Sequence, residues 1–224
     1  MLFFDPPFNF LKSIEKFSIF LYNVCKLVEG EFMNKTKRKI FETSMRLFSE
    51  KGYEATSIEE ITATVGVAKG TLYYHFTSKE EIFNFLVEEG MKLLKNSIEI
   101  KTAKCESTTD KIRAVLLVQL KVILKYENLL TIVMSQTWGN EPRNVFCKSK
   151  VLEHIEVIQR IIEEGQKNGD FFECNSELMA CEIFSLTCST LIYLRKTGEE
   201  LDVQKLYKEY ERTIFKRIEA YKGE

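Results

Sequence analysis

Residues 55–81 read ATSIEEITATVGVAKGTLYYHFTSKEE, and the pattern of this stretch decides the fold. Ile61 and Val65 belong to the apolar stripe of a short helix that Gly66 ends. A further short helix then runs to about His75. Two helices joined by a short turn with a glycine predict a helix-turn-helix, a motif whose second helix can enter the major groove of DNA. Helical hairpins with such a turn are also common in proteins that never touch DNA.

Capping signals mark the helix starts on both sides of this motif. Two overlapping capping boxes, one opened by Thr56 and one by Ser57, start its first helix, and Ser78 opens the helix that follows the motif. An earlier helix ends at Gly52 and carries basic residues in its first turn, against the helix dipole. This charge pattern indicates either an anion nearby or a solvated helix start. The basic residues are Lys35, Lys37, Arg38 and Lys39.

The second helix of the motif leaves an uncommon set of side chains outside the core. Leu72 and Phe76 are four residues apart and face inward. The positions left to face outward or sideways are Lys69, Gly70, Thr71, Tyr73, Tyr74 and His75. Exposed aromatic rings favour a partner, which is either DNA or, in part for Tyr73, the rest of the chain. A glycine inside a helix costs about 1 kcal/mol relative to alanine. Close approach of another backbone, such as a phosphate chain, is a reason to keep it.

The composition predicts an all-α chain without a resident metal or cofactor. Of the 224 residues only 10 are glycine and 3 are proline, whereas Leu, Ile, Glu and Lys are abundant. The net charge of -1 requires any nucleic-acid surface to be local. The 6 cysteines include no C-x-x-C pair, and 2 histidines are too few to complete a zinc set. The sequence contains no phosphate loop, no metal-ligand spacing and no nucleophile–base pair. We therefore expect no enzymatic activity.

The chain divides into three expected parts. Residues 1–32 form an N-terminal extension, residues 33–79 a helix-turn-helix domain, and residues 80–224 a larger helical domain. The extension is rich in phenylalanine without a clean period, and we expect translation to start at Met33. The alternative is an amphipathic helix from residue 11 to residue 27 that packs on the protein or touches a membrane surface. Without a secretory signal or a membrane-spanning stretch, we expect a cytoplasmic protein with reduced thiols.

The quoted stretch resembles the N-terminal domain of TetR/AcrR-family regulators. The likeness rests on residues 55–61, 65–76 and 78–81 and covers roughly residues 36–83 without a gap. It implies a homodimer that binds double-stranded DNA at a palindromic operator through residues 33–79. It also implies that residues 80–224 bind a small-molecule effector and dimerise. The expected function is that of a repressor released by a small apolar or amphipathic ligand.

The resemblance also assigns expected DNA contacts to individual residues. Thr56 is expected to bind a phosphate at the start of its helix. The residues expected in the major groove are Lys69, Gly70, Thr71 and Tyr74. Phosphate contacts are expected from Tyr73, His75 and Lys79. The chain departs from the family at Ala68, where a serine or threonine is frequent, so this helix start lacks a side-chain cap.

The larger helical domain offers a candidate ligand pocket and a candidate dimer interface. Bulky aromatics, a methionine and a histidine suit an apolar ligand, although aromatics at helical spacing are more often plain core. These pocket candidates are Tyr126, Met134, Trp138, Phe146 and His154. The last two amphipathic helices suit a four-helix dimer interface, with packing inside one chain as the alternative. The interface candidates are Leu178, Cys181, Cys188, Ile192, Tyr207, Tyr210 and Ile214.

Two other modes of regulation compete with release by a ligand. In a redox switch, Cys181 or Cys188 would meet its own copy across a dimer axis, because about 10 Å separates the two along one helix. Buried cysteines acting as small hydrophobic residues are the alternative to such a switch. A regulator that needs no ligand would show a collapsed core in the domain over residues 80–224.

Overall fold

The computed structural model describes residues 34–197 and 202–218, and within these ranges the chain is built from α-helices, which confirms the predicted all-α fold. Residues 1–33, including the predicted extension, lie outside the described residues. The helices are α2 (Lys35–Lys51), α3 (Ile58–Val65), α4 (Lys69–His75), α5 (Lys79–Thr102), α6 (Thr108–Lys125), α7 (Glu127–Gln136), α8 (Pro142–Lys167), α9 (Ser176–Thr197) and α10 (Val203–Ile218). We call α2–α4 the head and α5–α10 the body.

Local signals in the sequence set the helix ends of the head. Asn34 caps α2 by accepting a hydrogen bond from a first-turn amide, and Ser57 caps α3 in the same way. Gly52 ends α2 at a φ of 85°, and Gly66 ends α3 in the left-handed region at a φ of 78°. A residue with a Cβ would be strained at both turns, so the two glycines fix where the helices stop.

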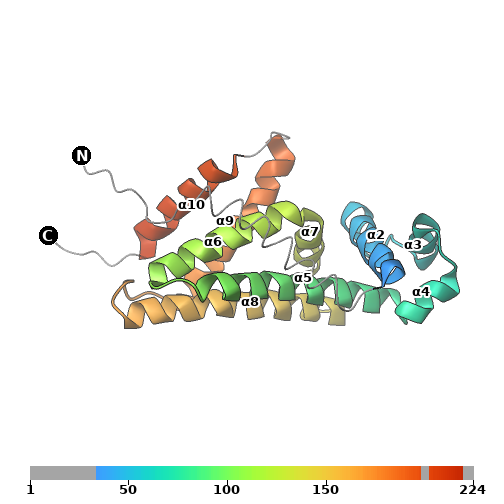
Figure 1. Ribbon diagram of the computed structural model, residues 1–224, viewed down its shortest axis with the longest axis horizontal. Helices are drawn as coiled ribbons and strands as arrows, with labels where there is room; N and C mark the ends of the chain where they lie inside the picture. The colour runs from blue at the N-terminus through green and yellow to red at the C-terminus, as the bar shows by residue number, and fades with distance from the viewer. Residues whose placement is uncertain (1–33, 198–201, 219–224) are drawn as a thin grey trace.

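Two long helices carry the body and reach the head (Figure 1). In this view α5 and α8 run side by side along the lower edge, and α5 continues to the right as far as α4. Helix α6 packs on both of them, α9 packs on α8 and α6, and α10 packs on α6. The head is thereby held at one end of an elongated bundle.

The core continues from the head into the body through aromatic contacts. The rings of Phe48, Tyr53 and Phe83 have centroids 5.1 to 6.0 Å apart, and Phe85 of α5 lies 5.5 Å from Phe76 of the head. Helix α2 also packs against α7 as well as α5. Both α5 and α7 are therefore in direct contact with the head.

Within the described ranges, none of the helices has the length and apolar content needed to cross a bilayer. The same residues contain no group of three or more His, Cys, Asp or Glu side chains placed to hold a metal ion.

Candidate nucleic-acid interface

Helix α4 presents its aromatic side chains to the outside, as expected for a helix that reads another molecule. Leu72 is fully buried and Phe76 is 1% exposed, which confirms the predicted inner face. Tyr74 is 84% exposed and Tyr73 is 43% exposed. The helix begins at Ala68 without a side-chain cap. The described residues thus leave most of the Tyr74 side chain uncovered, with the His75 ring 5.0 Å away as a neighbour.

None of the described residues requires the glycine at position 70, in the first turn of α4. A Cβ built at this position meets no atom within 4 Å, and the backbone is helical. Alanine would favour the helix, so neither packing nor conformation accounts for the glycine. The open space over Gly70 suits the close approach of an external backbone.

Lys69 is paired with the neighbouring helix. Its Nζ atom lies 2.6 Å from the Glu59 carboxylate of α3, and this hydrogen bond lowers the pKa of Glu59. Both side chains are more than half exposed. An exposed pair of this kind is weak, so a phosphate or base can replace Glu59 as the partner of Lys69.

The start of α3 corrects one predicted contact. The Thr56 side chain is 1% exposed, and its hydroxyl donates to the carbonyl of Gly52 at 2.9 Å. The neighbouring hydroxyl of Ser57 caps the helix and faces outward. Only one of the two overlapping capping boxes can supply the cap, and here it is the one opened by Ser57. We therefore move the expected phosphate contact at this helix start from Thr56 to Ser57.

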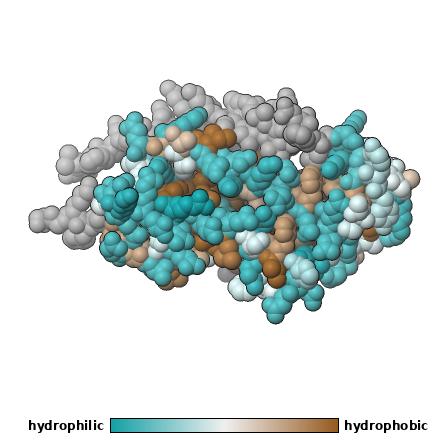
Figure 2. Space-filling view, turned by 90° about the horizontal axis from the view of Figure 1, so that it is seen from below, coloured by the Kyte–Doolittle hydropathy of each residue, from teal (hydrophilic) through white to brown (hydrophobic). Residues whose placement is uncertain are grey.

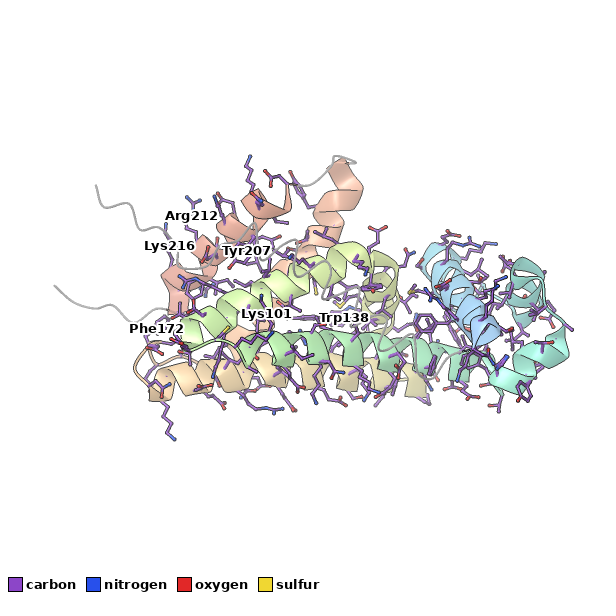
Figure 3. All side chains as sticks on the ribbon, in the orientation of Figure 1. Lys101, Trp138, Phe172, Tyr207, Arg212 and Lys216 are labelled. Carbon is purple, nitrogen blue, oxygen red and sulfur yellow. The ribbon has the colours of Figure 1, made fainter. Side chains whose placement is uncertain are left out.

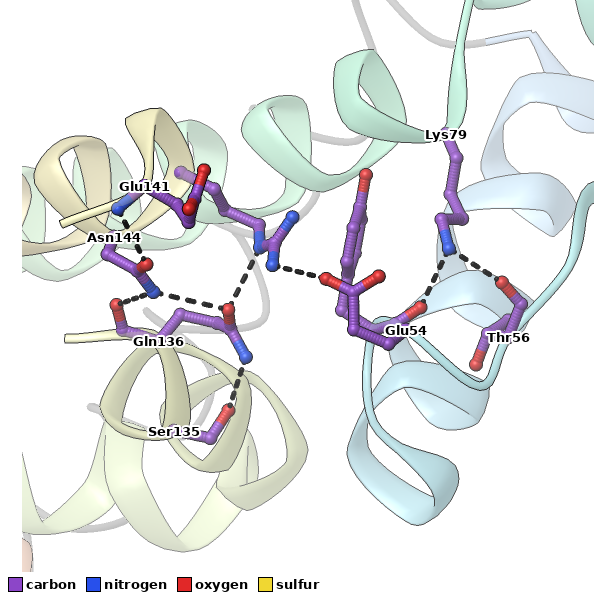
Figure 4. Close-up of polar contacts among 9 residues, drawn as sticks. Glu54, Thr56, Lys79, Ser135, Gln136, Glu141 and Asn144 are labelled. Carbon is purple, nitrogen blue, oxygen red and sulfur yellow. Dashed lines mark hydrogen bonds and ion pairs between the residues drawn. The ribbon is translucent and has the colours of Figure 1, made fainter. Parts of the chain in front are cut away.

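Lys79 turns back toward the loop before α3 (Figure 4). Its ammonium donates to the carbonyl oxygens of Tyr53 at 2.9 Å and Thr56 at 3.0 Å. It also lies 4.2 Å from the centre of the Tyr53 ring. Within this structure the side chain positions the start of α3, in addition to the phosphate contact expected from the sequence.

A contact between the head and the body, not identified from the sequence, forms around Tyr53. The Arg143 guanidinium at the start of α8 lies 3.9 Å from the centre of the Tyr53 ring and donates to the Glu54 carboxylate at 2.6 Å. Arg143 also donates to Gln136 at the end of α7, at 2.9 Å. Tyr53 thus has two cations of the body close to its ring, Arg143 from α8 and Lys79 from α5. Three separate helices meet here, so no local sequence pattern could have revealed the contact.

Within the described part of the chain, the predicted pocket residues do not share a single cavity. Tyr126 lines an apolar cavity of about 30 Å³ among α5, α6, α7, α8 and α9. Met134 lines a separate groove of about 360 Å³ between α7 and α9, and His154 lines a groove of about 260 Å³ between α5 and α8. The apolar cavity has room for only a molecule or two of water.

Two of the pocket candidates lie away from these spaces. Trp138 is 80% exposed, because α7 ends at Gln136 and the tryptophan falls in the turn beyond it. Phe146 is partly buried on α8, where the Lys150 ammonium lies 5.7 Å from its ring centre. The prediction that Trp138 is buried in the pocket is wrong in this structure.

His154 belongs to a buried polar cluster. It is 3% exposed, and its Nε2 atom lies 2.8 Å from Nε2 of Gln119. The Gln119 carbonyl oxygen in turn accepts from the hydroxyl of Thr187 at 3.3 Å. Burial lowers the pKa of His154 from 6.5 to about 4, so the imidazole is neutral near pH 7. These three side chains place polar groups in an otherwise apolar interior.

Helix α9 exposes an apolar face, whereas the apolar face of α10 is buried against other helices of the chain. Leu178 is 58% exposed and Ile192 is 74% exposed, with Cys181 and Cys188 partly buried between them. These four residues stand along one side of the helix. Burial raises the pKa of Cys188 to about 12, so its thiol is protonated near pH 7 and is a poor nucleophile.

Two of the predicted interface residues are buried inside the chain. Tyr207 and Ile214 are 7% and 4% exposed because that face of α10 packs on α6. Figure 3 shows Tyr207 on the α6 side of the helix, while Arg212 and Lys216 point outward. Tyr210 is partly buried and shares a 2.8 Å hydrogen bond with Thr190 of α9. An amphipathic pattern could not distinguish cover by the same chain from cover by a partner.

Comparison with known proteins places the head in a recognised class. Residues 40–85 match the family model for bacterial regulatory proteins of the tetR family. The chain is 26% identical over 152 residues to YfiR, an uncharacterized HTH-type transcriptional regulator of Bacillus subtilis, covering 64% of this chain and 72% of the relative. It is 46% identical over 52 residues to IcaR, the negative transcriptional regulator of the biofilm operon icaADBC in Staphylococcus epidermidis. That match spans 23% of this chain and 28% of IcaR.

A solved structure extends the similarity to most of the chain. A Clostridium perfringens protein, described as a proposed fatty acid metabolism regulator, is 32% identical with a TM-score of 0.76. The match covers 80% of this chain and 97% of that one. The similarity therefore includes the body as well as the head.

Proposed function

The chain belongs to the TetR family of bacterial transcriptional regulators, and on this premise we propose that it is a homodimeric repressor that a small molecule releases from a palindromic operator. The observation that carries the proposal is the outer surface of α4. Tyr74 is 84% exposed, and a Cβ at Gly70 would meet nothing. An exposed tyrosine close to a glycine with open space above it suits a helix that contacts DNA.

A dimer supplies the second recognition helix that a palindrome requires. The exposed side of α9, with Leu178 and Ile192, is the candidate contact between the two copies. In this arrangement residues 33–79 form the DNA-binding domain and residues 80–224 the ligand-binding and dimerisation domain. The two α4 helices then lie about 34–36 Å apart, one turn of the double helix. We place this activity in the cytoplasm, where the DNA is.

The effector is proposed to bind the body as an apolar or amphipathic molecule. The solved relative at 32% identity is described as a regulator of fatty acid metabolism, which supports this ligand class. Release of DNA requires the ligand to bind more tightly to a spacing of the two heads that does not fit the operator. The contacts of α2 with α5 and α7 offer a physical route from body to head.

The test begins with selection of an operator from random duplex DNA, followed by gel-shift titration. Tyr74→Ala is expected to lower the affinity for the selected operator. It should also reduce the difference in affinity between matched and mismatched sequences, since it removes a groove contact. Trp138→Ala is the matched control, because Trp138 is equally bare at 80% exposed but lies in the α7–α8 turn. Selection of no sequence, or equal affinity of the Tyr74 variant, contradicts the proposal.

A regulator that needs no ligand is the second candidate function. The cavity of about 30 Å³ favours it, because this space is too small for a typical effector without movement of its walls. A screen of apolar and amphipathic compounds distinguishes the two candidates. Release of the selected operator by any of them supports the ligand-released repressor, and the absence of both release and a change in melting temperature supports the second candidate.

A further inference from the structure

A groove between α5 and α8 combines a basic rim with a buried histidine. It encloses about 260 Å³. The face of the molecule seen from below in Figure 2 is mostly hydrophilic, with hydrophobic surface showing between polar side chains. The residues that matter here are Met91, Lys92, Lys95, Lys150 and His154. Cations, an apolar contact and a buried ring nitrogen therefore meet in one hollow.

The histidine offers the groove an unused hydrogen-bond donor. The amide nitrogen of Gln119 can only donate, so Nε2 of His154 accepts its hydrogen bond and the ring proton resides on Nδ1. Within the described part of the chain, Nδ1 is buried and has no hydrogen-bond partner. A buried donor without an acceptor is costly, and an oxygen of a bound molecule would satisfy it.

The groove lies next to the apolar interior. Met91 lines both the groove and the apolar cavity that contains Tyr126. Gln119 lines that cavity and holds His154, which lines the groove. Met91, a flexible side chain, is therefore shared by the walls of the groove and the cavity.

The basic rim has cations that can change partners. Lys92 and Lys95 are 58% and 52% exposed, and each lies 3.9 Å from its nearest carboxylate, a loose contact. Lys150 is 17% exposed and pairs with Glu88 and Glu153, both at 3.1 Å. Three lysines and two glutamates line the hollow, and the carboxylates nearest to Lys92 and Lys95, those of Glu89 and Glu99, lie outside its lining.

We propose that this groove binds the anionic group of an amphipathic effector, a phosphate or a carboxylate, on Lys92 and Lys95. A carbonyl or carboxylate oxygen of the same molecule accepts the proton of His154 Nδ1, and its apolar chain displaces Met91 and enters the cavity. This inference rests on the proposed function, since it gives the ligand-released repressor its effector class and its effector site. It also gives the small cavity a use, because only the apolar end of the ligand has to enter it.

Isothermal titration of the full chain without DNA tests the site. The probes are octanoyl-coenzyme A, octanoate, coenzyme A without an acyl group, and octanol. Binding of octanoyl-coenzyme A alone identifies a phosphate as the anion, and binding of octanoate identifies a carboxylate; either supports the proposal. Octanol binding as tightly as the tightest anionic probe, or no binding of an anionic probe with an apolar chain, overturns it.

Variants locate the binding in the groove. The double variant Lys92→Gln with Lys95→Gln is expected to raise the Kd of the anionic probe about tenfold or more, because two charge-assisted contacts are lost. Lys167→Gln with Lys208→Gln, exposed lysines outside the groove, should leave its Kd unchanged. Equal Kd values for the two double variants overturn the proposal. All four positions are on the surface, so the variants are expected to fold.

The role of His154 is tested with a variant that cannot donate. His154→Phe is expected to weaken the same probe, while unfolding followed by circular dichroism reports whether the variant folds. If it folds and binds as the wild type does, the donor role is wrong. If it does not fold, the lysine variants still decide the site. These titrations contain no DNA, so operator binding is measured separately. The proposed repressor can therefore bind its operator even if the groove does not bind the effector.

Discussion

The head and the body each hold a glycine inside a helix, and their surroundings differ. In α5, a Cβ at Gly90 would lie 2.0 Å from the end of the Leu129 side chain of α7, which would have to shift to make room. In α4, a Cβ at Gly70 would meet nothing within 4 Å. Packing inside the chain thus explains a residue of the body, whereas the chain offers no packing reason for the one in the head. The difference indicates that Gly70 of the head is explained by a molecule outside the chain.

Lowering the pH gives the largest expected effect, and it belongs to the body. Burial holds the pKa of His154 at about 4 instead of 6.5, so the unfolded chain takes up a proton more readily than the folded one. Stability is therefore fully present above pH 6.5 and falls as the pH drops toward 4, by about 3 kcal/mol from this residue. Urea unfolding at several pH values measures the slope. His154→Gln should flatten it, and an unchanged slope would show that other groups cause the loss.

Gly90→Ala sharpens the comparison from the side of the body. The new methyl group overlaps the end of the Leu129 side chain, which is 8% exposed and has to change its conformation, so we expect a loss of about 1–2 kcal/mol in the free energy of unfolding. Urea denaturation checks this. A neutral or stabilising result would mean that α7 moves away from α5 at little cost and that the body is not packed as described.

Arg143→Ala tests the boundary between the two regions. Its side chain is 16% exposed and contacts Tyr53, Glu54 and Gln136, so its loss should lower stability by about 1–2 kcal/mol. Operator affinity should also fall, because Tyr53 and Glu54 precede α3. Arg160→Ala is the control on the same helix, since its 3.9 Å pair with Glu156 is exposed and should be worth little. Equal effects of the two variants would remove Arg143 from the connection between head and body.

How much the sequence could predict also differs between the two regions. In the head, short-range signals such as Ser57, Gly66 and the inward Leu72 located the helices and the outer face of α4. The sequence could not decide whether Thr56 or Ser57 caps α3, because the answer depends on the hydrogen bond from the Thr56 hydroxyl to the Gly52 carbonyl.

In the body, the periodic stripes located the helices without revealing what covers them. Tyr207 faces α6 of the same chain, and Trp138 falls just past the end of α7 into solvent. The pairing of Gln119 with His154 and the groove beside it join helices far apart in sequence. Such contacts depend on helix crossing and on burial by distant segments, which amphipathic spacing does not encode.

Gly70→Ala tests most directly the claim that DNA accounts for the outer surface of α4. The substitution fits the helix and clashes with nothing, so the free energy of unfolding should rise by about 0.4–1 kcal/mol. Affinity for the selected operator should fall about tenfold, because the methyl group stands where a phosphate backbone would approach. The measurement is a pair of titrations, urea and operator, on the same preparation. A more stable protein that binds its operator less tightly is the predicted result, and one that binds its operator as tightly as the wild type would contradict the account.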